Sequence, residues 1–469
     1  MSGELPKGWV WTSLGNCIEI LDSKRKPINA EERQGRIQNK KEADLYPYYG
    51  ATGQVGWIDG YIFDEELILL GEDGAPFLDF SKDKSYIIKG KTWVNNHAHV
   101  LRAIENIANN HYICHYLNIF DYRNYITGTT RYKLNQSQMR KMPIPLPPLA
   151  EQQRIVNKIE ELFTNLDKGV QSLEEVKSKL KVYRQAILKY AMEGKLTEKW
   201  REENKDKVEP ASILLEKIDE LNKIHSINGD MSAGNDLPSK IPLNWIWSKL
   251  GNITLFHQYG WTTRAVNKGT VHLLRTTDIT SGRIDWDSVP YCEEEPENVG
   301  KYLLKDGDIV ISRAGSVGHS YLITNPPQKS IFASYLIRFR PLINGKFLSY
   351  FLKSPIYWNA ISEKSIGIAI PNVNASKLKQ INVPIPPLEE QQEIVNRIEK
   401  LFSLADNIEE TVDSKLRESK ILRQSILKKA FEGKLVPQDP NDEPAEVLLE
   451  KIKMEKSNKG KAIQGKLIQ

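Results

Sequence analysis

Residues 143–163 read PIPLPPLAEQQRIVNKIEELF, and residues 382–402 read NVPIPPLEEQQEIVNRIEKLF. From Glu151 and Glu390 onward the two stretches match at 10 of 13 positions, with a constant offset of 239 residues. A second pair, RQAILKYAMEGKL at 184–196 and RQSILKKAFEGKL at 423–435, keeps this offset and again matches at 10 of 13 positions. Ungapped self-similarity at a fixed spacing indicates an internal repeat of a whole module.

The repeat extends into the sequence around these stretches. LPKGWVWTSLGN at 5–16 recurs as IPLNWIWSKLGN at 241–252, and ITGTTRYKLNQSQMRKMPIPLPP at 126–148 runs alongside SIGIAIPNVNASKLKQINVPIPP at 365–387. The tails also agree, with PASILLEKI at 210–218 and PAEVLLEKI at 444–452. The middles, 20–125 and 255–364, match only occasionally and contain short β-prone runs between Gly and Asp turns. Each half is therefore predicted to be a mixed α/β block, a long helix and a short tail helix.

Two long helices are predicted to follow the proline runs. From Leu149 to Glu193 there is no proline and one glycine, and from Leu388 to Phe431 there is neither. Proline cannot continue a helix, so the runs stiffen the exit from each block. Apolar residues recur at heptad spacing, which predicts a narrow stripe that needs a partner helix. The stripe residues are Ile155, Ile159, Leu162, Leu166, Leu173, Val176, Leu180 and Tyr183, then Ile394, Ile398, Leu401, Ala405, Ile408 and Val412.

The length of these helices predicts how the chain is arranged. Around 45 residues at ~1.5 Å per residue make a rod of roughly 65 Å. The second helix is expected to run back along the first, so that an antiparallel coiled coil separates two blocks related by a pseudo-twofold axis. Such an arrangement suits a DNA duplex, because a duplex has its own local twofold and half-site spacing follows from protein dimensions. One or two extra helical turns after Ser172 are then expected to lengthen an unread spacer between two half-sites.

Composition excludes several classes of protein. The 469 residues are 40% hydrophobic and 27% charged, which is ordinary for a soluble globular chain. No apolar run approaches the ~18–20 residues of a membrane span, and the first residues lack a signal-peptide core. Three scattered cysteines fit a reducing cytoplasm. Residues 238–382 hold 17 Lys and Arg against 10 Asp and Glu, whereas residues 1–142 hold 18 against 17, so charge alone makes nucleic acid a candidate partner.

The repeated helical motifs resemble the conserved regions of the DNA-specificity subunit of type I restriction-modification systems. The motifs are PLPPLAEQQRIV…RQAILKYAMEGKLTEKWR and PIPPLEEQQEIV…RQSILKKAFEGKLV. In the second block, the segments GDIVISRAGSVG and GIAIPNVNASKLKQINVPIPP also resemble this family. The resemblance covers nearly the whole chain and implies two α/β (α+β) target-recognition domains on antiparallel helices. It implies a non-catalytic subunit that reads an asymmetric, bipartite site in double-stranded DNA.

The resemblance also implies partners and boundaries. The partners are two adenine-N6 methyltransferase (modification) subunits that use S-adenosylmethionine, and restriction/translocase subunits that use ATP and Mg; this chain itself is expected to hold no cofactor or metal. The implied domains are 1–148 and 238–387 for target recognition, 149–200 and 388–435 for the conserved helices, 201–237 for a short helix and linker, and 436–469 for a tail. The loop ITGTTRYKLN at 126–135 departs from the pattern, because it lacks the proline of the matching IAIPNVN.

Candidate DNA contacts are loop residues that can donate to phosphates or base edges. Arg reading guanine and Asn or Gln reading adenine each discriminate by ~1–3 kcal/mol, whereas clustered Lys and Arg position the protein on phosphates. In block one the candidates are Lys24, Arg25, Lys26, Tyr49, Thr52, Gln54, Asn96, His97, His99, Thr129, Thr130 and Arg131. In block two they are Tyr259, Trp261, Thr262, Arg264, Arg275, Thr276, Asp278, Arg313, Ser316, Ser334, Tyr335, Asn372 and Asn374. Solvated charge or turn chemistry is the alternative for each residue taken singly.

Other readings of the sequence predict different chemistry. TNPPQKS at 324–330 imitates the Asn-Pro-Pro core of adenine methyltransferases, but Gln328 stands where an aromatic residue must stack on the flipped base. A surface turn is favoured there, although a self-contained methylating or cleaving enzyme stays open as an alternative. A coiled-coil adaptor with no DNA role is the third hypothesis.

Two possible metal sites are weaker than their structural alternatives. Glu72 and Asp73 could hold a metal, but the aligned turn in the second block offers a serine and an arginine, so a reading loop or plain turn is favoured. His111, Cys114 and His115 lack the second pair of ligands that a structural zinc requires, so half-buried positions on a helix are predicted. Docking of partner subunits is expected at the EGKL ends and EQQ starts of the long helices.

Overall fold

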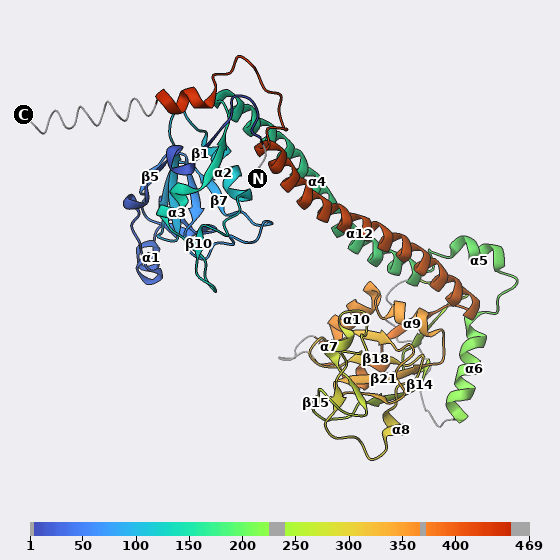
Figure 1. The fold of residues 1–469 in the computed structure, drawn as a ribbon. Helices are drawn as coiled ribbons and strands as arrows, with labels where there is room; N and C mark the ends of the chain where they lie inside the picture. The colour runs from blue at the N-terminus through green and yellow to red at the C-terminus, as the bar shows by residue number, and fades with distance from the viewer. Residues whose placement is uncertain (1–3, 225–239, 366–371, 452–469) are drawn as a thin grey trace, which may run out of the picture. The chain divides into compact units, whose positions relative to one another are not determined.

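The fold is described from a computed structural model that describes residues 4–224, 240–365 and 372–451 (Figure 1). The chain divides into two compact units, residues 1–174 with 413–469 and residues 175–412. Each unit contains one globular block and about half of each of two long helices. The GIAIP part of the second-block motif, at 367–371, lies outside the described residues.

Block one is built on two four-stranded sheets. The first has the strand order β2-β9-β6-β7 with antiparallel neighbours, and the second has the order β4-β3-β8-β5 with a parallel β3–β8 pair. The strands are β1 Val10–Ser13, β2 Ile18–Ile20, β3 Tyr46–Gly50, β4 Gly53–Ile58, β5 Phe63–Asp64, β6 Leu67–Gly71, β7 Ser85–Ile88, β8 Lys91–Val94, β9 Ala98–Ala103, β10 Ile126–Thr127, β11 Lys133–Leu134 and β12 Pro143–Leu146. The helices are α1 Ala30–Ile37, α2 Asn110–Ile119 and α3 Gln136–Lys141, with 3-10 turns η1 Leu14–Asn16, η2 Asp22–Lys24 and η3 Glu42–Asp44.

Block two repeats the first sheet and varies the second. Its sheet β14-β21-β18-β19 has the same connectivity as β2-β9-β6-β7, whereas the other sheet has the order β15-β17-β16-β20. The strands are β13 Ile246–Lys249, β14 Thr254–Tyr259, β15 Ala265–Val266, β16 His272–Leu274, β17 Tyr291–Cys292, β18 Ile309–Ser312, β19 Ser320–Leu322, β20 Ser330–Phe332, β21 Leu336–Pro341 and β22 Asn382–Ile385. The helices are α7 Thr276–Ile279, α8 Val299–Tyr302, α9 Gly345–Phe351, α10 Pro355–Ser365 and α11 Ala375–Lys379.

The proline runs do more than stiffen the chain, because part of each run forms a strand. β12 pairs antiparallel with β1, with Val10 opposite Leu146, and β22 pairs in the same way with β13, with Ile246 opposite Ile385. Proline is compatible with these strands because each two-stranded ladder has an edge that needs no N–H donor. The predicted mixed α/β blocks and their internal repeat are confirmed.

The long helices are α4 Leu149–Met192 and α12 Leu388–Phe431, each of 44 residues. Two shorter helices, α5 Glu198–Asn204 and α6 Ala211–Ile224, follow α4, and residues 445–451 form a helix after α12. In unit 1 the guanidinium of Arg423 lies 4.1 Å from the ring centroid of Phe163 and forms an ion pair with Asp167. The cation therefore contacts both an aromatic face and a carboxylate on the neighbouring helix, which stabilises the pair.

The same clasp recurs in unit 2 at an offset of 239 residues. Arg184 lies 5.5 Å from the ring centroid of Phe402 and pairs with Asp406 at 2.7 Å and Glu409 at 2.9 Å. Just beyond the end of α4, the Leu196 carbonyl accepts from Arg397 at 2.8 Å. A later residue of the first segment thus contacts an earlier residue of α12, because Arg184 contacts Phe402 whereas Leu196 contacts Arg397. The helices thus pack antiparallel, as predicted.

The predicted heptad stripe is correct near the blocks and wrong in part farther along. Ile155, Ile159, Ile394 and Ile398 are buried in the unit cores. Three stripe residues are instead exposed: Val176, Tyr183 and Ile408. A strict 3.5-residue spacing drifts by ~20° per heptad on a straight 3.6-residue helix, so residues assigned to one stripe rotate out of it.

The EQQ motif joins each long helix to its own block. In unit 1 the Gln152 side chain accepts from the Asn109 backbone N–H, and Gln153 accepts from the Asn109 side chain, both at 2.9 Å. The same pair of bonds recurs in unit 2, both at 3.0 Å, at Asn344, Gln391 and Gln392. Since Glu and the first Gln of each motif are buried, the expectation that they dock a partner is wrong.

The EGKL segments have a similar internal role. Gly194 and Gly433 adopt left-handed backbone, with φ of +71° and +69°. A β-carbon at these positions would come within 2.4 Å of Pro242 and 2.2 Å of Pro6 respectively. Glycine is therefore required both for the turn and for the close approach of the block. Among the described residues, no helix is long and apolar enough to cross a membrane.

Candidate nucleic-acid interface

The predicted contact residues of block two gather at one edge of its sheets. Backbone hydrogen bonds link the ends of the strands there: Trp261 N–H to the Phe332 carbonyl at 2.8 Å, and Arg313 N–H to the Tyr335 carbonyl at 2.9 Å. The Ala333 N–H also donates to the carbonyl of Leu274, at 2.9 Å, just before Arg275. Segments that lie 22 to 71 residues apart in sequence thus form one surface.

An aromatic and an arginine form the centre of this edge. The guanidinium of Arg313 lies 5.1 Å from the ring centroid of Tyr259, and the Tyr259 hydroxyl accepts from the Ala375 N–H at 3.0 Å. The Arg313 carbonyl accepts from the Val373 N–H at 3.0 Å, which places Asn372 and the following turn beside it. Buried polar atoms without a hydrogen-bond partner among the described residues include Arg313 Nε and Asn372 Oδ1. Such orphaned donors and acceptors beside an exposed edge are available to a ligand.

Several block-two candidates are held by their neighbours. Arg275 donates to Asp278 from Nε at 3.0 Å and from Nη2 at 2.7 Å, so this pair is fixed before any contact with DNA. Asn374 caps α11 by accepting from the Lys377 N–H at 2.9 Å. The remaining candidates lie on the exposed or half-exposed part of the edge: Thr262, Arg264, Thr276, Ser316, Ser334 and Tyr335.

An acidic segment that the sequence reasoning missed supports the first of these loops. The carbonyl of Glu294 accepts from Trp261 Nε1 at 2.9 Å, and the Glu293 N–H donates to the Arg264 carbonyl at 3.0 Å. The run EEEPE at 293–297 is the only sign of this role in the sequence.

In block one the candidates also gather at the corresponding edge. The Asn95 N–H donates to the Tyr49 carbonyl at 3.0 Å, which joins the β3–β4 turn to the loop before β9. The Glu72 N–H donates to the His97 carbonyl at 2.8 Å, and the Leu134 N–H donates to the Glu72 carbonyl at 2.9 Å. Exposed or half-exposed side chains on this edge include Lys24, Lys26, Tyr49, Thr52, Gln54, Asn96, His97, Thr129, Thr130 and Arg131.

Two block-one candidates point inward. The Arg25 side chain donates to Glu72 Oε2 and to the Ala98 carbonyl, each at 2.7 Å, which removes it from the predicted phosphate grip. His99 is 1% exposed, and its ring nitrogens lie 2.6 Å from Asp22 Oδ2 and 2.8 Å from the Leu134 carbonyl. A direct DNA contact by His99 is therefore ruled out in this structure, because the side chain is fully enclosed.

The carboxylates near His99 could approach one metal ion, but they already have cationic partners. Asp22, Glu72 and His99 have ligand atoms within 4.8 Å of one another. Arg25 pairs with Glu72 at 2.7 Å and with Asp22 at 3.4 Å. Burial raises the pKa of Asp22, but the hydrogen bond and charge of His99, the Val100 N–H and the charge of Arg25 lower it overall. This is an ion-pair network that holds a loop.

The other metal candidate has structural partners. His111 Nδ1 lies 2.9 Å from Glu160 Oε1. Burial raises the pKa of Cys114 to about 12, and its carbonyl accepts from the Ser85 hydroxyl at 2.8 Å. Burial lowers the pKa of His115 to about 4, and its ring packs edge-on against Phe163 at 5.8 Å. His111 and His115 thus fasten α2 to α4 within unit 1, and Cys114 fastens α2 to β7.

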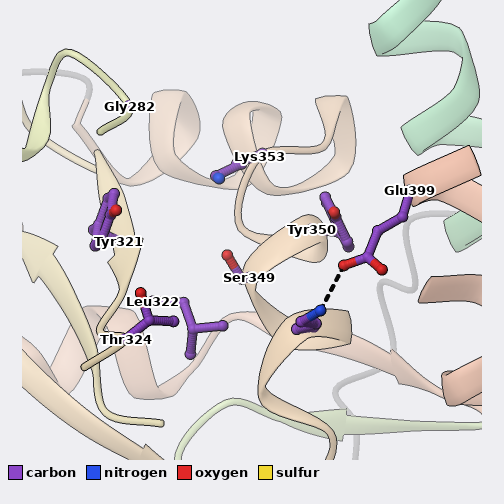
Figure 2. A pocket seen from close by; sticks show the side chains of 9 residues that line it. Gly282, Tyr321, Leu322, Thr324, Ser349, Tyr350, Lys353 and Glu399 are labelled. Carbon is purple, nitrogen blue, oxygen red and sulfur yellow. Dashed lines mark hydrogen bonds and ion pairs between the residues drawn. The ribbon is translucent and has the colours of Figure 1, made fainter. Parts of the chain in front are cut away.

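A hollow of about 200 Å³ lies in unit 2 near the Ile309 end of β18, which is the end away from Arg313. Figure 2 shows Glu399 next to Tyr350 at one side of the hollow. The Lys346 amine, which also lines the hollow, forms an ion pair with the Glu399 carboxylate at 2.7 Å. Glu399 stands 239 residues after Glu160, so this ion pair repeats the link between His111 and α4. The hollow therefore belongs to the frame that joins block and helix.

Comparisons with known proteins agree with this arrangement. The chain is 28% identical over 472 residues to the Type I restriction enzyme EcoDI specificity subunit of Escherichia coli, covering 98% of both chains. It is 29% identical to the EcoKI specificity subunit of Escherichia coli strain K12, again covering 98% of both.

Solved structures share the fold. The HsdS subunit from Thermoanaerobacter tengcongensis matches with a TM-score of 0.51 and 18% identity, covering 92% of this chain and 98% of that one. A chain from a study of complex assembly and conformational transition in the type I R-M system matches with a TM-score of 0.62 and 17% identity, covering 92% and 100%. The family model described as type I restriction modification DNA specificity domain matches residues 6–178 and 257–418. Since these two stretches make up most of the sequence, the chain belongs to the family of type I restriction-modification DNA specificity proteins.

Proposed function

We propose that this chain is the DNA-specificity subunit of a type I restriction-modification complex and reads an asymmetric, bipartite site in double-stranded DNA. The observation that carries the proposal is the repeated frame with two unlike reading edges. Both blocks share one sheet connectivity, yet the side chains gathered at the edge of each block differ. Two different edges read two different half-sites, so the whole site is asymmetric.

The reading edges differ in the kind of contact they offer. Block two presents Arg313 stacked on Tyr259, beside polar atoms that have no hydrogen-bond partner in the described part of the chain, which suits base-edge reading. Block one presents exposed Lys24 and Lys26 beside Gln54 and Asn96, which suits phosphate positioning together with adenine reading. Which bases each edge reads depends on the angles at which its side chains approach the bound DNA.

We assign the chemistry to partner subunits. Modification subunits supply S-adenosylmethionine and transfer the methyl group to adenine N6, and restriction subunits supply ATP-driven translocation with Mg. In this chain the Asn325-Pro326-Pro327 string lies in a turn, where the Asn325 N–H donates to Asp306 at 2.9 Å, which supports a structural role. The protein is expected to act in the cytoplasm, where its DNA substrate is.

Repeated apolar pairs on the long helices support docking of two copies of one partner. Val182 and Tyr183 are 68% and 41% exposed, and Ile421 and Leu422, which stand 239 residues later, are 67% and 48% exposed. One pair lies in each unit, just before the clasp arginine. Exposed apolar pairs kept at equivalent positions mark a binding surface, and we assign it to the modification subunits.

The test of the proposed function is an exchange of block one. Replacing residues 1–142 with the corresponding block of another specificity subunit is expected to change one half of the methylated sequence and leave the other half intact. Methylome sequencing of cells that carry the complex reads both halves at once. A change in both halves, or in neither, contradicts modular reading.

Two controls separate the alternatives. A self-contained methyltransferase would transfer methyl groups when the purified chain alone is mixed with S-adenosylmethionine and DNA, whereas the proposed subunit needs its partners. A DNA-independent adaptor would show weak and salt-insensitive DNA association, whereas many phosphate contacts make log K fall steeply with log salt.

A further inference from the structure

A buried carboxylate in unit 1 connects three segments that lie far apart in sequence. Asp22 accepts from the Val100 N–H on Oδ1 at 2.8 Å. Its other oxygen, Oδ2, accepts from His99 Nδ1 and from Gln136 Nε2, each at 2.6 Å. The turn η2, strand β9 and the start of α3 therefore meet at one carboxyl group.

The hydrogen-bond partners of His99 determine its protonation state. Nε2 lies 2.8 Å from the Leu134 carbonyl, which can only accept, so Nε2 carries a proton. Nδ1 lies 2.6 Å from Asp22 Oδ2. The Asp22 carboxyl group already accepts from the Val100 N–H and from Gln136 Nε2 and faces the Arg25 cation, so it acts as an ionised acceptor and Nδ1 carries a proton as well. With both nitrogens donating, the enclosed ring is an imidazolium.

The charges around the ring accommodate this cation. Arg25 lies 3.4 Å from Asp22 and 2.7 Å from Glu72, and Glu72 Oε2 lies 3.7 Å from His99 Nδ1. From the hairpin side, Lys133 faces Glu72 at 3.4 Å. The two cations His99 and Arg25 thus balance the two carboxylates, and the exposed Lys133 closes the network toward solvent.

We propose that the His99 imidazolium is a positioning residue for the half-site read by block one. It ties the β10–β11 hairpin, through the Leu134 carbonyl, to the Asp22 carboxylate beneath the reading edge. That hairpin carries the exposed residues Thr129, Thr130 and Arg131. This inference rests on the proposed function, because it names what sets one of the two reading edges.

The effect of His99 is expected only in the DNA half-site that block one reads. β21 occupies the same place in block two that β9 occupies in block one, and its second residue is the fully buried Ile337, where β9 has His99. Block two therefore has no equivalent ion at this place, and its half-site provides an internal reference.

The experiment compares the full-length chain with His99→Gln, using duplexes that contain its methylated motif. The Gln side chain donates from a single amide nitrogen, so it cannot donate from two separate positions as the His99 ring does. His257→Gln, on an exposed histidine of β14, is the matched control. Affinity is measured by fluorescence anisotropy at one fixed pH. Single-base changes in each half of the site measure discrimination.

The expected results are specific to block one. Wild type and His257→Gln bind equally, whereas His99→Gln binds about tenfold more weakly, as removal of one charge-assisted hydrogen bond predicts. Discrimination in the first half-site falls about tenfold, and discrimination in the second half-site is unchanged. Wild-type affinity and discrimination in His99→Gln, or equal losses in both halves, overturn the proposal.

A second measurement needs no variant. Nitrogen-15 NMR of selectively labelled histidine is expected to show a proton on both ring nitrogens of His99 in the free protein, as its two acceptors require. A neutral ring overturns the inference whatever the DNA results are. If the wild-type chain binds no DNA sequence specifically while His99 is doubly protonated, the proposed function fails and the charge assignment stands.

Discussion

Glu151 and Glu390 occupy the same place in the two repeats, but they have different partners. Glu390 is fully buried and accepts from the Thr197 hydroxyl at 2.7 Å, from Arg201 Nε at 2.9 Å and from Trp245 Nε1 at 2.9 Å. All of its charge is therefore compensated inside unit 2.

The first repeat lacks two of these partners. At the offset of 239 residues, Val436 replaces the threonine and Pro440 replaces the arginine. Burial raises the pKa of Glu151, and the nearby Trp9 indole and the charge of Arg154 offset this only in part. Within the described residues, neither Trp9 Nε1 nor Glu151 Oε1 has a hydrogen-bond partner. An acid whose pKa is raised by folding takes up a proton on folding, so the folded state gains stability as pH falls.

The two glutamates should therefore respond oppositely to the same substitution. Glu390→Gln leaves a partly buried guanidinium without its charge partner and is expected to cost about 1.5–3 kcal/mol. Glu151→Gln removes an uncompensated buried charge, so it is expected to raise the unfolding midpoint at neutral pH and to flatten its rise toward acid pH. Thermal unfolding followed by circular dichroism at several pH values measures both. Glu389→Gln, on the exposed neighbour, is the control, and equal effects at positions 151 and 390 would contradict the assignment.

At the scale of the helix, the repeated apolar pairs predict where the modification subunits bind. Val182→Glu is expected to reduce the complex to one modification subunit per chain, because Ile421 in the other unit still presents the equivalent pair. Ile421→Glu alone should do the same, and the double variant should bind none. Removing one such apolar contact and adding a charge weakens binding by roughly tenfold or more.

Native mass spectrometry of the assembled complex counts the bound subunits. Lys181→Glu, at an exposed neighbour on the same helix, changes the charge by two units instead of the one unit of Val182→Glu and removes no apolar contact, so it is a stringent control for charge. Loss of both partners in either single variant, or retention of both in the double variant, would show that docking occurs elsewhere.

The long helices also show what the heptad spacing of apolar residues predicts correctly and what it does not. Proline runs, uninterrupted apolar spacing and the matched motifs predicted both 44-residue helices nearly to the residue. The same spacing placed Val176, Tyr183 and Ile408 in the buried stripe, and they are exposed. Small differences between the heptad period and the true helical period accumulate over several turns, and only packing against the partner decides which side chains are covered.

At the scale of the whole molecule, the antiparallel pair predicts that helix length sets the spacer. The segment of α4 near Ser172 faces the segment of α12 near Glu418, since Val170, Glu174, Leu416 and Ser419 line one hollow in unit 1. An insertion must therefore be made in both helices to keep the contacts on either side in register.

Seven residues inserted after Ser172 together with seven after Glu418 should lengthen the unread spacer. Seven residues add ~10 Å, or about three base pairs at ~3.4 Å each, and leave both half-sites unchanged. Methylome sequencing reads the new spacer directly. The same insertion in the turn at 205–209, outside the long helices, should leave the spacer as it was. A folded double-insertion variant with the original spacer would falsify the ruler hypothesis.

The sequence by itself determined the repeat, the two long helices, the family and most of the loops that form the reading edges. These features are encoded locally, by proline, by glycine and by apolar spacing, or by comparison of the chain with itself. Only the tertiary structure decided that Arg25 and His99 are internal, that the EQQ and EGKL motifs bind their own blocks, and that Glu293 and Glu294 support a reading loop. Whether a polar side chain faces solvent depends on partners tens or hundreds of residues away, and no local pattern specifies those partners.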